Sequence, residues 1–126
     1  MKLVKDVMTK KVVTVRDEDD VKQACKLLAK NRISGMPVMN RLGRLVGFIS
    51  ERDVIAAVPK PGFDKASVRK LMTKKVRTIA GDEPLTHASK IFSEEDYRLL
   101  PVMKGPKLIG IIARKDVVNF MMGNFY

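Results

Sequence analysis

The hydrophobic positions in the first half of the chain predict a strand, a helix, two further strands and a second, shorter helix. The longer helix has the i, i+3, i+4, i+7 spacing of an amphipathic helix. Asp19 and Asp20 precede it and belong to the residue types that cap helices. Its apolar stripe consists of Val21, Ala24, Cys25 and Leu28.

The strands of this half are predicted at residues 12–15, 37–39 and 45–49, with a hairpin turn at 40–44 between the last two. Strand 45–49 is almost entirely apolar, so burial on both of its faces is expected. A short helix then runs from Ser50 to Ala57.

The same order of elements returns in the second half, because the sequence contains an internal repeat. Residues 8–15 (MTKKVVTV) and 72–79 (MTKKVRTI) match at an offset of 64. The offset holds through the next helix to the Pro-Val-Met segments 37–39 and 101–103, and becomes 63 beyond the hairpin turn. In the second copy, the helix stripe consists of Leu85, Ala88, Ser89 and Phe92.

We therefore predict an α/β (α+β) fold built from two β-α-β-β-α repeats. The predicted division is repeat 1 at residues 1–58, a linker at 59–64 and repeat 2 at 65–126. A repeat of about 60 residues buries little apolar surface alone, so the two are expected to share one core.

Composition excludes several classes of protein. Cys25 is the only cysteine and His87 the only histidine, which excludes an internal disulfide and a Cys/His zinc site. Nothing orients serine, histidine and aspartate as a catalytic triad, and neither paired metal carboxylates nor a Lys-Ser/Thr phosphate loop is visible. No metal and no enzymatic activity are therefore expected. The longest apolar stretch, residues 108–113, is far too short to span a membrane, and no signal peptide is visible. We expect a cytoplasmic protein without membrane attachment.

The net charge of +11 points to anionic partners. Residues 1–63 carry +6 and residues 64–126 carry +5, so the excess is spread evenly and forms no basic tail. This distribution favours a well-solvated surface over a dedicated nucleic-acid face, although both interpretations stay open.

The junction at Ser50 can be interpreted from residue chemistry alone. A strand that ends before Ser50 and a helix that begins there would expose unpaired backbone amides and a hydroxyl, which suit an anion. Asp53, one turn into the helix, offers a carboxylate that suits a ribose diol. The alternative is a plain capping pair, in which a serine is followed by an acid three residues later.

The Met-Thr start of each repeat, the apolar-Pro-Val strand and the Gly-x-x-Ser-x-x-Asp ending at 47–53 resemble the CBS (cystathionine β-synthase-type) domain family. The resemblance covers nearly the whole chain, in two copies. It implies a pseudo-twofold pair of repeats that binds AMP, ADP, ATP or S-adenosylmethionine, with no required cofactor. It also implies regulation of a partner and no catalysis.

The resemblance further implies two nucleotide sites, each formed by residues of both repeats. The first would combine Ser50, Asp53, Met72, Arg77, Tyr97, Arg98, Leu99, Leu100 and Pro101, with Arg98 as phosphate ligand. The second, weaker site would combine Met8, Val13, Ile33, Ser34, Gly35, Met36, Pro37, Arg114 and Asp116. Ala113 replaces the hydroxyl residue there, so Arg114 or Lys115 would have to contact a phosphate. For the apolar members, core packing is the alternative.

Two functions follow from these observations. The first is an adenosine-nucleotide-binding regulatory module that acts in trans on an unknown regulated protein or as a homodimer. The alternative is a nucleic-acid-binding accessory protein that uses the basic surface of the same scaffold. A homodimer is expected because the helices and the apolar segment 120–126 leave more hydrophobic surface than one pair of repeats covers.

Overall fold

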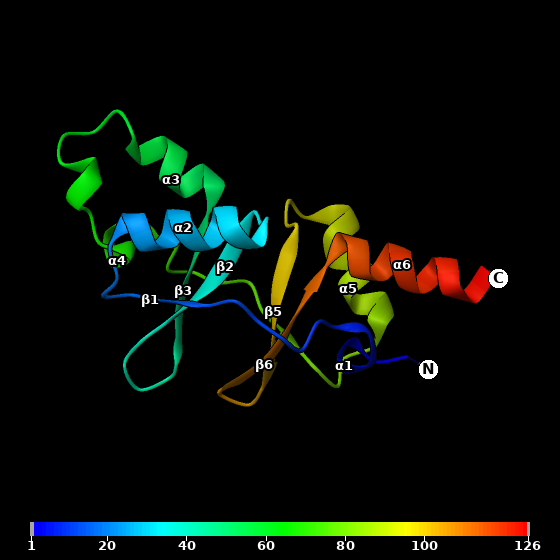
Figure 1. Cartoon of the computed structure of the whole chain (residues 1–126). Helices are drawn as coiled ribbons and strands as arrows, with labels where there is room; N and C mark the ends of the chain where they lie inside the picture. Colours follow the sequence, from blue (N-terminus) through cyan, green and yellow to red (C-terminus); the bar gives the residue numbers. More distant parts are fainter. Residues whose placement is uncertain (1, 126) are drawn as a thin grey trace. The chain divides into compact units, whose positions relative to one another are not determined.

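Residues 2–125 are described by the computed structural model, in which helices and strands alternate as the repeat predicts (Figure 1). The α/β fold class is confirmed. The elements are α1 (Val4–Val7), β1 (Val15–Arg16), α2 (Val21–Asn31), β2 (Gly35–Met39), β3 (Leu45–Ser50), α3 (Glu51–Ala57), the 3-10 helix η1 (Phe63–Lys65), α4 (Val68–Leu71), β4 (Ile79–Ala80), α5 (Leu85–Glu94), β5 (Leu99–Lys104), β6 (Lys107–Ala113) and α6 (Arg114–Phe125).

The chain forms two compact units that do not coincide with the two halves of the sequence. Residues 13–76 form one, here called the central unit, and residues 1–12 with 77–126 form the other, the terminal unit. The short helices α1 and α4, here called the leading helices, are therefore exchanged. The helix α1 belongs to the unit that contains β4, β5 and β6, and α4 belongs to the unit that contains β1, β2 and β3.

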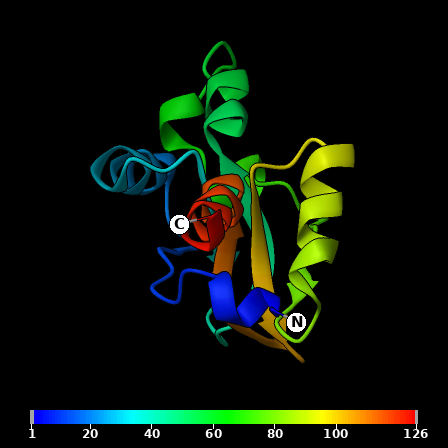
Figure 2. The ribbon, with the colours of Figure 1, turned by 90° about the vertical axis from the view of Figure 1, so that its right-hand side faces the viewer.

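Each unit contains one three-stranded sheet with the same topology. In the central unit β1 pairs with β2 in parallel and β2 pairs with β3 in antiparallel orientation. In the terminal unit β4, β5 and β6 repeat this order. In the central unit the helices gather at one end of the sheet, and the β2–β3 turn lies at the other end (Figure 1). Figure 2 shows α5 beside the β5–β6 hairpin of the terminal unit.

The first predicted strand is misplaced. Only Val15 and Arg16 pair with β2, opposite Val38 and Met39, so the observed strand starts at the last residue of the predicted range 12–15. The valines before it extend the chain without joining the sheet ladder. Burial of β3 on both faces is also wrong, because Gly47 and Ile49 are buried while the alternate positions are partly exposed. As an edge strand of a small antiparallel pair, β3 follows the period of two.

Two clusters of buried side chains replace the single shared core that the sequence suggested. The central cluster includes Met36, Val38 and Ile49 from the sheet, and Val68 from α4 completes it. The terminal cluster is built from the matching residues of β5 and β6, and Val4 from α1 completes it. Each core thus takes one completely buried valine from a leading helix that starts the other sequence repeat. The two repeats are therefore linked by the exchange of their leading helices and not by a single common core.

The cap and apolar face predicted for α2 are confirmed. The Asp20 carboxylate accepts a hydrogen bond from the Gln23 amide at 3.0 Å, and Val21, Ala24 and Leu28 are buried. Cys25 packs against the same core as a small apolar group. In α5 the fully covered positions are Leu85, Ala88 and Ile91, whereas Ser89 and Phe92 of the predicted stripe are only partly buried.

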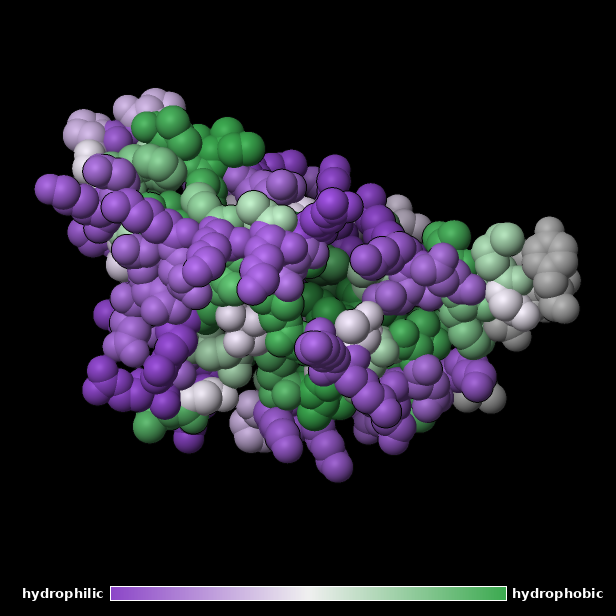
Figure 3. Space-filling view, in the orientation of Figure 1, coloured by the Kyte–Doolittle hydropathy of each residue, from purple (hydrophilic) through white to green (hydrophobic). Residues whose placement is uncertain are grey.

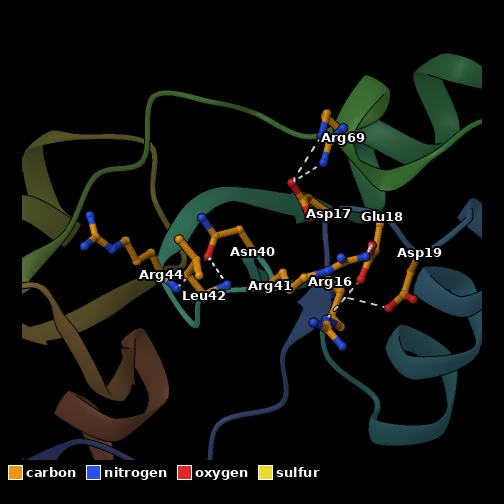
Figure 4. Close-up of polar contacts among 9 residues, drawn as sticks. All are labelled: Arg16, Asp17, Glu18, Asp19, Asn40, Arg41, Leu42, Arg44 and Arg69. Carbon is orange, nitrogen blue, oxygen red and sulfur yellow. Dashed lines mark hydrogen bonds and ion pairs between the residues drawn. The ribbon is translucent and has the colours of Figure 1, made fainter.

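An ion pair attaches the leading helix α4 to the central unit. The Asp17 carboxylate, in a residue that is only 8% exposed, accepts hydrogen bonds from Nε and a terminal nitrogen of Arg69 at 3.1 and 2.8 Å (Figure 4). The Arg69 amide also donates to the Asp17 carbonyl at 3.0 Å. The terminal unit has Gly81 and Lys5 at the matching positions, so this pair has no counterpart there.

The apolar C-terminal segment continues α6, whose Met121 and Met122 are 41% and 50% exposed. Packing of this segment on the other repeat or on a second subunit therefore stays a prediction, and Tyr126 lies outside the described residues. None of the helices within residues 2–125 has the length and hydrophobicity needed to cross a lipid bilayer.

Candidate functional site

Ser50 and Asp53 form a complete capping box at the junction of β3 and α3. The Ser50 hydroxyl oxygen accepts from the Asp53 amide at 3.2 Å, and the Asp53 Oδ2 atom accepts from the Ser50 amide at 3.0 Å. The Ser50 hydroxyl also donates to Oδ2 at 3.1 Å. The capping alternative is therefore realised, and it holds the Asp53 carboxylate in one orientation with Oδ2 already bonded.

The other carboxylate oxygen of Asp53 faces a residue that sequence reasoning left out. The Thr73 hydroxyl donates to Asp53 Oδ1 at 3.4 Å. Thr73 is placed by a short antiparallel bridge to β3, in which its amide and carbonyl exchange hydrogen bonds with Phe48 at 2.8 and 2.9 Å. The Met-Thr dipeptide occurs in both repeats and could have indicated this threonine, but only the methionine was assigned to the site from the sequence.

A glycine allows this close approach. A Cβ atom at Gly47 would lie 3.0 Å from the Thr73 carbonyl oxygen and would overlap the Met72 side chain. Only glycine therefore lets the segment after α4 cross β3 at this distance. Met72 thus packs over the strand immediately before the Ser50–Asp53 junction, and is partly buried against the central core.

The terminal unit repeats this arrangement but lacks the serine hydroxyl. The Asp116 Oδ2 atom accepts from the Ala113 amide at 2.8 Å, and the Thr9 hydroxyl donates to Oδ1 at 3.5 Å. Met8 and Thr9 cross β6 over Gly110 as their counterparts cross β3. The carboxylate–threonine pair is therefore present twice, and only the hydroxyl at residue 113 is absent.

The expected row of unpaired amides at the start of α3 is largely wrong. The Glu51 amide donates to the Ser34 carbonyl at 2.9 Å, and the Asp53 amide is used by the cap. The Arg114 amide at the start of α6 likewise donates to the Arg98 carbonyl at 3.2 Å. These bonds tie each helix start to the beginning of β2 or β5, so a phosphate would have to be held mainly by side chains.

Three arginines of the terminal unit are candidates for contact with an anionic ligand. Arg98 is exposed, and Nε of the neighbouring Arg114 donates to the Tyr97 carbonyl at 2.8 Å. A terminal nitrogen of Arg77 contacts Glu95 at 3.2 Å. Among the side chains that the structure describes, the Arg77 Nε atom is the only buried nitrogen or oxygen without a hydrogen-bond partner. An acceptor supplied by a ligand would satisfy this donor.

The predicted residues of each site are divided between the two units. For the first site, Ser50, Asp53 and Met72 lie in the central unit and the other six in the terminal unit. For the second, Met8, Arg114 and Asp116 lie in the terminal unit and the rest in the central unit. Val13, Ile33 and Leu99 are partly buried, whereas Gly35, Met36, Pro37, Leu100 and Pro101 are buried, which for their side chains favours core packing.

Comparison with known proteins identifies the repeat. The family model of the CBS domain matches residues 4–60 and again residues 68–123. The chain belongs to the CBS domain family. The two matches cover the two halves of the internal duplication, so this chain is a CBS pair.

One relative, matched over most of both sequences, is an uncharacterised protein of Methanocaldococcus jannaschii, 29% identical over 95% of this chain and 91% of its own length. Other curated relatives have enzyme names, a homoserine O-acetyltransferase of Methanococcoides burtonii and an L-aspartate semialdehyde sulfurtransferase of M. jannaschii. This CBS pair spans about a quarter of the length of each, 24% and 23%. Most of each enzyme chain thus lies outside the matched region.

Two solved CBS pairs have nearly the same fold as this chain and contain adenosine compounds. CBSX2 in complex with AMP is 28% identical, with a TM-score of 0.90, and each chain covers 100% of the other. The CBS pair of protein MJ0100, in complex with 5′-methylthioadenosine and S-adenosyl-L-methionine, is 28% identical, with a TM-score of 0.86 and 98% coverage of both chains.

Proposed function

We propose that this CBS pair is a regulatory module that senses an adenosine compound. The observation that carries the proposal is the duplicated carboxylate–threonine pair, Asp53 with Thr73 and Asp116 with Thr9. In both, Oδ2 is fixed by a backbone amide while Oδ1 has only a long contact with a hydroxyl. A half-buried carboxylate held in this way is preorganised to accept hydrogen bonds from a diol.

Two predicted residues of the terminal unit have donors that suit other parts of such a ligand. The unpartnered Arg77 Nε donor suits a ring nitrogen of adenine, and the exposed Arg98 suits a phosphate. The ligands of the two solved CBS pairs differ in charge but share the adenosine group. Adenosine recognition is therefore the common part of the proposal, and a preference among AMP, ADP, ATP, S-adenosylmethionine and 5′-methylthioadenosine is the variable part.

Isothermal titration calorimetry of the whole chain tests this function. The five adenosine compounds are compared with guanosine monophosphate at the same ionic strength, because the guanosine compound keeps the ribose and phosphate and changes the base. We expect saturable binding of at least one adenosine compound and none of the guanosine control. Absence of heat with all five compounds, in a protein that melts cooperatively, overturns the proposal.

We further propose that the module forms a homodimer through the last helix of each unit. Ile55 on α3 and Val58 at its C-cap are 68% and 56% exposed, and their repeat counterparts on α6, Val118 and Met121, are 60% and 41% exposed. The same two positions are thus apolar and uncovered in both units. Large apolar side chains at repeated exposed positions are typical of a self-association surface.

The change Ile55→Glu is expected to weaken this dimer by at least tenfold, because it places a charge at the apolar contact. Sedimentation of the parent and the variant over a 100-fold range of concentration measures the change. Leu42→Glu serves as control, because Leu42 is 80% exposed on the β2–β3 turn and belongs to neither α3 nor α6. A parent protein that is monomeric throughout this range excludes the dimer.

A further inference from the structure

The basic residues are spread evenly along the sequence but not over the helices. On α2, Lys22, Lys26 and Lys30 recur every four residues, and Arg32 follows at the C-cap. All four are exposed. We call these four residues the α2 basic stripe. Figure 3 shows hydrophilic side chains across the position that α2 occupies in Figure 1.

The charge of this stripe is not offset by an acid within α2 or by an ion pair of the described residues. The helix itself contains no acidic residue, and none of the ion pairs in the described part of the chain involves these four side chains. The nearest acids in sequence, Asp19 and Asp20, lie before the first turn. Both are occupied by backbone amides, those of Arg16 and Gln23. Like charges four residues apart destabilise a helix, so this stripe carries a cost in the free molecule.

The second repeat shows whether the fold itself requires these charges, because it contains the matching helix. At an offset of 64, the counterparts of the four residues are Thr86, Lys90, Glu94 and Asp96. The first set carries +4 and the second −1, although α2 and α5 have the same place in their units. The stripe is thus a property of one helix and not of the fold.

The end of the stripe is also conformationally unfavourable. Arg32 has φ 52° and ψ 47°, and it is the one non-glycine residue of residues 2–125 with a positive φ. Glycine or asparagine suits this left-handed position, because a Cβ atom there crowds the following carbonyl. An arginine at such a position adds a cation to the stripe at the expense of local stability.

We propose that the α2 basic stripe binds the phosphate backbone of a nucleic acid. One four-residue step advances about 6 Å along the helix, so Lys22, Lys26 and Lys30 form a row along one side of α2 that matches a linear polyanion, and Arg32 adds a fourth cation at the C-terminal end of the helix. The other exposed residues from Lys22 to Arg32 are Gln23, Ala29 and Asn31, with no large apolar or aromatic side chain. Protein interfaces are depleted in lysine and depend on aromatic anchors, so this composition favours phosphates over a protein partner.

Binding is measured by fluorescence anisotropy with labelled 20-nucleotide single-stranded RNA, single-stranded DNA and duplex DNA, at salt concentrations from 50 to 200 mM. The test variant is Lys22→Gln/Lys26→Gln/Lys30→Gln. The control variant, Lys90→Gln/Lys104→Gln/Lys107→Gln, removes the same charge from exposed positions of the terminal unit. Over this range the parent is expected to lose affinity about 20- to 40-fold more than the test variant, because about three phosphate contacts are absent from the variant. The control variant should resemble the parent.

Three results overturn the proposal: no binding by the parent, equal losses in the two variants, or equal binding of a labelled polyglutamate chain. The RNA and DNA probes distinguish the two sources of the phosphate backbone. Arg32→Gly adds a second test. It should lower affinity for the nucleic acid several-fold while raising Tm by about 3 °C, because glycine relieves the left-handed backbone. If the affinity and Tm both fall in Arg32→Gly, Arg32 has a structural role only.

Discussion

Replacement of Asp53 by alanine is expected to weaken the binding of every adenosine compound about 10- to 150-fold. The estimate corresponds to about 1.5–3 kcal/mol for the loss of a charged hydrogen-bond acceptor. Calorimetry with the compound that binds the parent best measures the change. The substitution also removes half of the capping box, so Tm should fall.

Asp53→Asn separates these two effects. Its amide oxygen can still accept from the Ser50 amide, so the cap and Tm should be largely kept. The charge that favours a ribose diol is nevertheless lost, and binding should again be weak. Asp116→Asn is the matched change in the terminal unit, and it should leave any site that uses Asp53 unaffected. If both Asp53 variants bind adenosine compounds as well as the parent, Asp53 is a capping residue and the assignment is wrong.

Exchange of the hydroxyl between the repeats should redistribute affinity for AMP. Ala113→Ser should strengthen the site that uses Asp116, and Ser50→Ala should weaken the site that uses Asp53, each by about tenfold or more. A hydrogen bond to a charged phosphate contributes about 1.5–3 kcal/mol. The structure adds a condition, because the Ser50 hydroxyl now donates to Asp53 Oδ2 and would have to turn toward the phosphate.

Tm and AMP affinity, measured on the same two variants, decide between capping and binding. An N-cap serine is worth about 1 kcal/mol, so Ser50→Ala should lower Tm in either case. Binding predicts that the AMP affinities move in opposite directions in the two variants. If Tm changes while both affinities stay constant, the Ser50 hydroxyl acts only as a cap. 5′-Methylthioadenosine, which has no phosphate, is the ligand control and should respond little to either change.

The sequence by itself determined the repeat, the α/β class and most of the elements. These features depend on local patterns: the spacing of Val21, Ala24 and Leu28 defines one helix, and Asp20 caps it within three residues. The junction at Ser50 and Asp53 was found for the same reason, since its two residues lie one helical turn apart. The duplication strengthened each of these predictions, because a second copy repeats the pattern.

Tertiary structure alone decided which segments join which core. The exchange of α1 and α4, the pair of Asp17 with Arg69, and the contact of Thr9 with Asp116 link residues 52 to 107 positions apart. No periodicity encodes such distances. These contacts form only when the folded chain brings distant segments together. Glycines such as Gly47 and Gly110 allow the close approach, because they let a second segment cross the strand. The exposure of a side chain to solvent also depends on tertiary structure, because a lysine or an isoleucine is exposed only where no other element packs against it.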